Sequence, residues 1–84
     1  MLQPNYPNPF SDVTTVRFTL ETATSVIVDI FDAYGRVVAT LASKRYPAGT
    51  HALTWRAEGL ATGVYFYRLR TPQQRLVRSM VIVK

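Results

Sequence analysis

The chain contains no cysteine, and it has only one histidine and five acidic residues among its 84. Without cysteine there is no disulfide framework, so a domain of this size depends on its packed core or on a neighbouring domain. The missing cysteines do not identify a compartment, since exported modules do without them as easily as cytosolic ones. One histidine, His51, is too few for a zinc site, and we interpret it as a structural side chain.

The few acidic residues are too dispersed for acid–base catalysis. We expect each of them beside a turn or on a solvent-facing strand position: Asp12, Glu21, Asp29, Asp32 and Glu58. The serines have only His51 as a possible base, and no oxyanion-hole pattern surrounds them. The four glycines stand in separate turns, which excludes a phosphate-binding loop. The sequence therefore predicts a non-enzyme with no catalytic residue, no metal and no cofactor.

The formal charge of +5 comes from eight arginines and two lysines, which first suggests a nucleic-acid partner. The arginines are scattered, however, and no basic run or helical pattern accompanies them, so we expect no nucleic-acid binding. No apolar run is long enough to span a bilayer, and no signal segment opens the chain. We expect no membrane insertion, and we expect any export signal of a parent protein to lie upstream of this piece.

What the chain does contain is a series of short β-forming runs, of which residues 63–70 are the strongest. We predict that this run is a central strand. Arg68 and Arg70 occupy its even positions, and because burying unpaired charge is costly, the odd positions must form the core face. That face carries Tyr65, Tyr67 and Leu69. The hydroxyl of Tyr65 is expected to bond to the backbone of the preceding turn.

Further strands are predicted over residues 13–20, 25–31, 36–42, 50–56 and 75–84, separated by turn signals. Alternation assigns the remaining core positions to Val16, Phe18, Val28, Ile30, Leu53 and Trp55, and it directs Ile27, Asp29 and Phe31 outward. Six to seven short strands without a helical period indicate an all-β fold, an immunoglobulin-like antiparallel β-sandwich. We expect one domain over residues 1–84, with a proline-rich entry segment at 1–10 and the sandwich at 11–84. Tyr6 and Phe10 are expected to pin the entry segment against the sandwich.

The last predicted strand is apolar on both faces. Arg78, Met80, Ile82 and Lys84 share one face, and Val77, Val81 and Val83 share the other. If the valines supply the core, the first face is exposed and is our predicted recognition surface for a partner, which would add a strand at this sheet edge. The alternative is that Met80 and Ile82 are core residues.

Five motifs occur in a recognisable order: the entry motif at 5–10, the turn motif at 32–38, the segment 48–51 with Trp55, the run 60–66 and the terminal segment 80–84. Together they closely resemble the type A C-terminal sorting domain of type IX secretion cargo. The resemblance implies an immunoglobulin-like domain joined to an upstream cargo, often a secreted enzyme. It also implies recognition by an outer-membrane translocon, cleavage by a sortase-like peptidase, and a location outside the cell or on its surface, reached through the periplasm.

Other assignments remain open beside this resemblance. A flagellar hook-capping immunoglobulin-like domain shares several of the motifs, although such a domain is normally embedded in a longer chain and Lys84 ends this one. A carbohydrate-binding module of a polysaccharide-degrading enzyme would need an exposed aromatic face, for which Tyr34, Tyr46 and Phe66 are candidates. A structural accessory domain that stabilises a catalytic neighbour is a third possibility.

Overall fold

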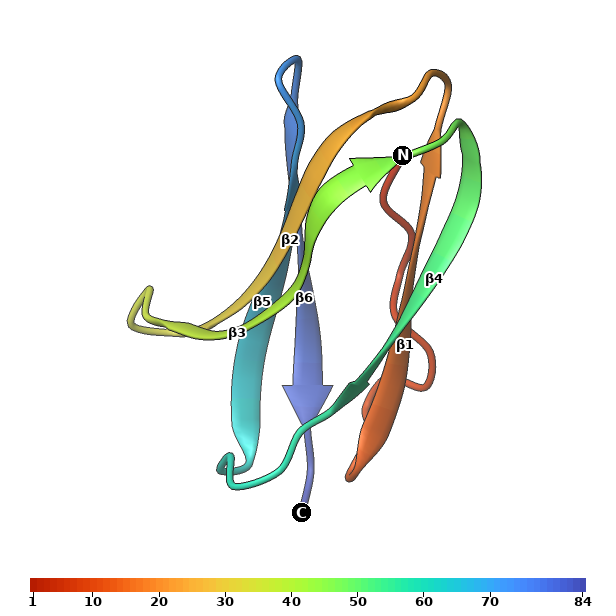
Figure 1. Ribbon diagram of the computed structural model, residues 1–84. Coiled ribbons are helices and arrows are strands. Elements are labelled where there is room, and N and C mark those ends of the chain that lie inside the picture. The colour runs from red at the N-terminus through yellow and green to blue at the C-terminus, as the bar shows by residue number, and fades with distance from the viewer.

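The computed structural model describes all residues, 1–84, and consists of six β-strands that form two facing sheets (Figure 1). The strands are β1 (Val13–Leu20), β2 (Thr24–Asp32), β3 (Val37–Tyr46), β4 (Gly49–Arg56), β5 (Gly63–Arg70) and β6 (Arg75–Ile82). One sheet pairs β1 with β4, and the other has the order β3-β2-β5-β6. All these pairs are antiparallel. The predicted all-β, immunoglobulin-like sandwich is confirmed, and β5 lies inside the larger sheet as expected.

Strand lengths differ from the prediction mainly in β3, which runs on to Tyr46 although residues 43–46 are mostly polar. Backbone pairing continues through this stretch, with Lys44 opposite Val26 and Arg45 opposite Ser25. A sheet ladder needs backbone donors and acceptors rather than apolar side chains, so composition alone placed the end of this strand too early.

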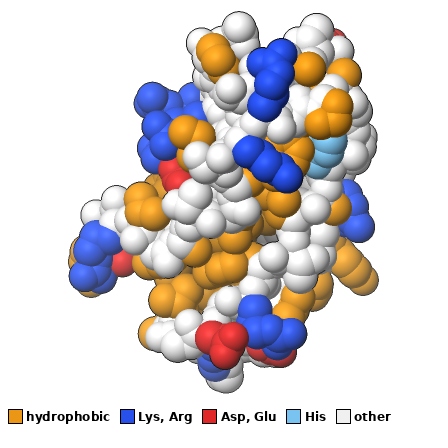
Figure 2. Space-filling view, viewed as in Figure 1, with side chains coloured by type: hydrophobic (Ala, Val, Ile, Leu, Met, Phe, Trp, Pro, Cys, Tyr) orange, Lys and Arg blue, Asp and Glu red, His pale blue; other side chains and the backbone are white.

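The core forms between the two sheets, and eight of the nine predicted core residues are buried in it: Val16, Phe18, Val28, Ile30, Trp55, Tyr65, Tyr67 and Leu69. The ninth, Leu53, is only partly buried and packs against the margin of the core. Leu53 lies on β4, whose only strand partner is β1, so one flank of this residue has no neighbouring strand. Figure 2 shows apolar side chains reaching the surface in the middle of the face on which β3 and β4 lie.

The entry segment follows the free edge of β1 and then crosses to β6. Leu2 bridges Phe18 and Tyr6 bridges Thr15, both antiparallel, whereas Phe10 bridges Ile82 in parallel. Phe10 is buried as expected, with its ring 6.0 Å from that of Trp55. The expectation for Tyr6 was wrong, because the backbone pairing with Thr15 turns its side chain outward and leaves it 74% exposed.

Asn5, the neighbour of Tyr6, takes the inward position instead and is 3% exposed. Its Nδ2 donates to Thr14 Oγ1 at 2.9 Å and to the carbonyl of Pro7 at 3.2 Å. The entry segment is therefore attached by a buried polar contact as well as by Leu2 and Phe10.

Asp29 was expected on a solvent face, and this was wrong in one respect: its side chain leaves the core but is covered by neighbours. The residue is 5% exposed, because Arg68 and Arg70 each donate an Nη2 to its Oδ2, at 3.2 and 3.1 Å. Thr40 donates to Oδ1 at 3.0 Å. Arg68 and Arg70, whose charges predicted that the even face of β5 lies outside the core, thus both bind the Asp29 carboxylate on the outer face of the sheet.

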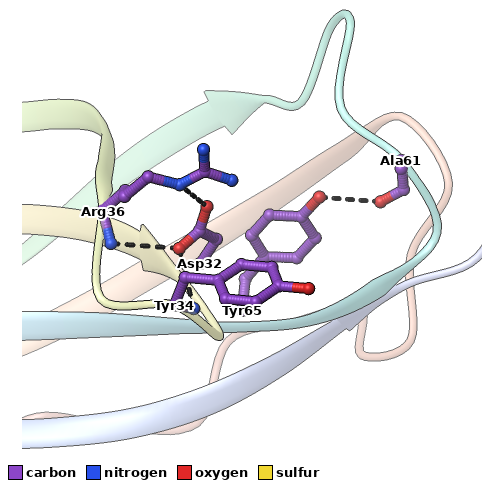
Figure 3. A network of polar contacts seen from close by, with 5 residues as sticks. All are labelled: Asp32, Tyr34, Arg36, Ala61 and Tyr65. Carbon is purple, nitrogen blue, oxygen red and sulfur yellow. Dashed lines mark hydrogen bonds and ion pairs between the residues drawn. The ribbon is translucent and has the colours of Figure 1, made fainter.

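Side chains also fix the turn between β2 and β3 and the connection that leads into β5 (Figure 3). Asp32 accepts hydrogen bonds from the backbone amides of Tyr34 and Arg36 through Oδ1, and from Arg36 Nε through Oδ2. Gly35 supplies the positive φ of 84° that this turn requires. The Tyr65 hydroxyl donates to the carbonyl of Ala61 at 2.8 Å, which confirms the predicted partner in the preceding turn.

Candidate recognition surface

The predicted recognition surface centres on β6, an edge strand whose only ladder partner is β5. Directly opposed residues of an antiparallel pair lie on the same face of the sheet. Met80 is opposite Tyr65 and Arg78 is opposite Tyr67, both tyrosines of the core face. The even positions of β6 must therefore face the core.

This register decides between the two readings of the last strand. Met80 and Ile82 are fully buried, whereas Val77 and Val83 are each 50% exposed. Of the two readings that the sequence left open, the one in which the valines supply the core is wrong, and the predicted recognition role of the Met80 and Ile82 side chains goes with it. Met80 and Ile82 are core residues, and no partner contacts their side chains without opening the fold.

Arg78 lies on this inner face as well, but at the rim of the sandwich, where it remains exposed. Its Nε donates to the carbonyl of Leu2 at 2.8 Å. On the opposite strand the Tyr67 hydroxyl donates to the carbonyl of Gln3 at 2.6 Å, and burial raises the pKa of this phenol. Arg78 and Tyr67 therefore connect β6 and β5 of the larger sheet to the entry segment by hydrogen bonds.

Lys84 follows β6 and is exposed, yet it is attached at two points. Its backbone amide donates to Thr62 Oγ1 at 2.9 Å, and its Nζ donates to the carbonyl of Ala57 at 2.7 Å. Both acceptors belong to the connection between β4 and β5. The last residue thus has a defined position at the surface rather than a free one.

The entry segment covers the second half of the β6 edge. The Phe10 amide donates to the Val81 carbonyl at 3.1 Å, and the Val83 amide donates to the Phe10 carbonyl at 2.9 Å. Asn8 Oδ1 accepts from the Val81 amide at 2.9 Å. Only the first half of β6 remains an open edge.

His51, the one histidine, has a backbone carbonyl and no acid or serine as its hydrogen-bond partner. His51 packs against the rings of Phe18 and Tyr46, and its Nε2 is 2.8 Å from the carbonyl of Pro47. No cluster of three or more histidine, cysteine or acidic side chains is present that would hold a metal ion. No helix is long and apolar enough to cross a membrane.

The three candidate aromatic residues of a carbohydrate-binding face are not brought together. Tyr34 is 85% exposed in the turn between β2 and β3, whereas Tyr46 lies at the far end of β3 with its ring 5.3 Å from Phe18 in the core. Phe66 lies on the outer face of the larger sheet, stacked on Phe31 with centroids 5.6 Å apart. No flat platform of several exposed rings results.

A comparison with protein families assigns the chain to one of them. Residues 5–84 match the family model described as the secretion system C-terminal sorting domain. The chain belongs to this family. The motif resemblance to type IX sorting domains is thereby confirmed, and membership implies that proteins carrying the domain are exported through that system.

A solved structure supports the fold assignment. The chain is similar to part of PorZ from Porphyromonas gingivalis, described as an essential bacterial surface component of the type IX secretion system. The TM-score is 0.69 at 21% identity, over 99% of this chain but only 11% of PorZ. At this identity the likeness shows a shared fold. No curated protein matches the chain.

Sequence reasoning missed the contacts that attach the entry segment to the rest of the sorting domain. The bonds from Arg78 to Leu2, from Tyr67 to Gln3 and from Val81 to Asn8 each join residues more than 60 positions apart. The proline content of the segment predicted an extended conformation, but no local pattern predicts which sheet edge such a segment pairs with.

Proposed function

We propose that this domain is a non-catalytic sorting signal, which directs a parent protein through the type IX translocon and to attachment at the cell surface. The observation that carries the proposal is the family match over residues 5–84. The partners that we propose with it are an outer-membrane translocon, a sortase-like peptidase and a covalently linked upstream cargo, a secreted enzyme.

Within this proposal, the residues of the predicted recognition surface take different roles. Lys84 and Arg78 are exposed and positioned by backbone carbonyls, so both present charge at defined places. Met80 and Ile82 act indirectly, because they hold β6 against the core. We assign the direct contact with the translocon to the accessible edge of β6 and to the Lys84 end.

The test is a reporter carrying an export signal, fused upstream of residues 1–84 and expressed in a host with a type IX system. We expect the reporter at the cell surface or in the medium, and in the periplasm of a matched strain that lacks the translocon. Retention of the folded fusion in the periplasm of the competent strain would sink the sorting proposal.

Removal of Lys84 separates recognition from folding. This lysine is exposed, and its loss removes one exposed and one partly buried hydrogen bond, so the melting temperature should change little while export falls. Lys44→Ala is the matched control, since Lys44 is also exposed and makes no ion pair. Equal export of both variants would exclude Lys84 from recognition.

A further inference from the structure

The first half of β6, residues 75–79, is an open sheet edge. The backbone groups of Val81 that bond to Asn8 and Phe10 point away from β5. Alternate residues of a strand direct their backbone groups to the same side, so those of Val77 and Ser79 also point away from β5. Neither residue makes a hydrogen bond to any segment on that side.

Two of the features with which proteins block strand addition are missing from this edge, although Arg75 and the inward-facing Arg78 carry charge along it. No proline stands within residues 75–79, and the pairing of β5 with β6 contains no bulge. Val77 is 50% exposed on the outer face of the strand. The edge is therefore available to a further strand over five residues.

A half-open cavity of about 770 Å³ adjoins this open edge, at the end of the sandwich where β1 ends and β6 begins. Leu76, Val77 and Arg78 line it on one side, and Leu2 and Leu20 line it on the other. The chain begins near the end of the sandwich at which β6 begins, so the entry segment and β6 flank the same opening (Figure 1). A strand added to β6 would run beside this cavity, with alternate side chains directed into it.

The chemistry of the cavity defines what those side chains would be. Leu76 and Met1 offer apolar surface, whereas Leu2 and Leu20 are only 2% and 6% exposed and eight of the 13 lining residues are polar or charged. The Nε of Arg78 is bonded to Leu2, whereas its two Nη groups make no hydrogen bond or ion pair. Glu21 also lines the cavity but does not pair with Arg78. An apolar side chain and a carboxylate would complement these groups.

The domain itself provides a precedent for pairing at this edge. Phe10 already pairs in parallel with Ile82, on the same side of the same strand. A strand on residues 75–79 would continue that interface toward the beginning of β6. The formal charge of +5 opposes a second copy of this chain and favours an acidic partner.

We propose that residues 75–79 of β6 take up an extended acidic and apolar segment of a partner protein as an added strand. An apolar side chain of that segment enters the cavity beside Leu76, and a carboxylate pairs with Arg78. Backbone hydrogen bonds supply affinity, and the cavity supplies specificity. That the partner belongs to the secretion machinery rests on the proposed function, whereas the binding site itself does not.

The test uses a capped synthetic peptide of seven residues. Threonine occupies the four odd positions, and leucine, glutamate and leucine occupy the three even positions in that order. A scrambled peptide with adjacent leucines is the control. We expect the alternating peptide to slow hydrogen exchange at the Val77 and Ser79 amides, which have no hydrogen-bond acceptor outside the β5 ladder in the free domain. Absence of that protection at saturating peptide, or equal protection by the scrambled peptide, would overturn the proposal.

Two matched substitutions test the backbone contact. Val77→Pro removes the outward amide, which the fold does not use, and should weaken peptide binding about tenfold. Val77→Thr keeps the amide and should bind within about twofold of the unsubstituted domain. Exchange measured on the unsubstituted domain keeps the test valid even if the proline variant proves unstable.

The carboxylate contact is tested with Arg78→Gln and a peptide in which glutamine replaces glutamate. The unsubstituted domain should prefer the glutamate peptide several-fold, and the variant should show no preference. Concentration-dependent dimers that Val77→Pro abolishes would instead identify a second copy as the occupant and overturn the assignment. Peptide binding and reporter export are read separately, so a domain that binds the peptide but does not export its reporter contradicts only the sorting function.

Discussion

Trp55 shows what a single residue contributes to a domain this small. It is 7% exposed, and its ring meets that of Phe10 edge to face, so it joins β4 to the entry segment. Trp55→Ala should lower the free energy of unfolding by roughly 3–5 kcal/mol, because it removes a large buried surface and leaves a cavity. Urea denaturation followed by circular dichroism measures this difference.

The exposed Tyr6 serves as the control for this measurement, and Tyr6→Ala should change stability by less than about 0.5 kcal/mol. A loss below about 1 kcal/mol for Trp55→Ala would contradict the packing described here.

Asp32 makes the stability of its turn depend on pH. Hydrogen bonds from the Arg36 amide, together with those from Tyr34 and the Arg36 side chain, hold the pKa of this carboxyl below its ordinary value of 3.8. A carboxyl with a lowered pKa stabilises the fold above its unfolded pKa, and this contribution disappears as the pH falls through the folded value.

The variant Asp32→Asn should therefore melt at a lower temperature than the unsubstituted domain at pH 7, and the gap should close at pH values well below 3.8. Melting temperatures of both proteins between pH 2 and pH 7 provide the measurement. A gap that stays constant across this range would show that the charge of Asp32 does not act as described.

At the scale of elements, the entry segment behaves as part of the sandwich although it is not a regular strand. It buries Leu2 and Phe10. The Leu2 carbonyl accepts a hydrogen bond from Arg78, and the Asn8 side chain accepts one from the Val81 amide. Its crossing from β1 to β6 connects the edges of the two sheets.

Deleting residues 1–9 should consequently destabilise the domain, because it exposes apolar core surface and leaves the hydroxyl of the buried Tyr67 without its acceptor. We expect a loss of at least about 2 kcal/mol in chemical denaturation, together with faster exchange at the Val81 amide. Unchanged stability would instead mean that the segment is free to serve as a recognition element by itself.

At the scale of the whole molecule, the sandwich has its own core of 16 buried apolar residues. A sorting signal and an accessory domain that stabilises a catalytic neighbour differ in what their removal does to the parent protein. Removing the domain from a parent protein should leave the melting temperature of the remaining part unchanged and abolish its export. A lower melting temperature with unchanged export would favour the structural role.

Much of this arrangement follows from the sequence by itself. Alternation of apolar and polar residues determined the β class, the core face of β5 and the inward positions of β1 and β2, because side chains of a strand alternate between two faces whatever its partners are. The order of the motifs also identified the family, since five weak signals at fixed spacing are jointly specific.

Where both faces of a strand carry apolar residues, only the tertiary structure determined which face is buried. In β6 the alternation was ambiguous, and the register with β5 placed Met80 and Ile82 inside. Leu53 reached only the margin of the core, and Tyr6 turned outward, because sheet edges and bridges rather than local composition determine what covers a side chain. The open edge at residues 75–79 arises in the same way, from a segment some seventy positions earlier that covers only half of β6.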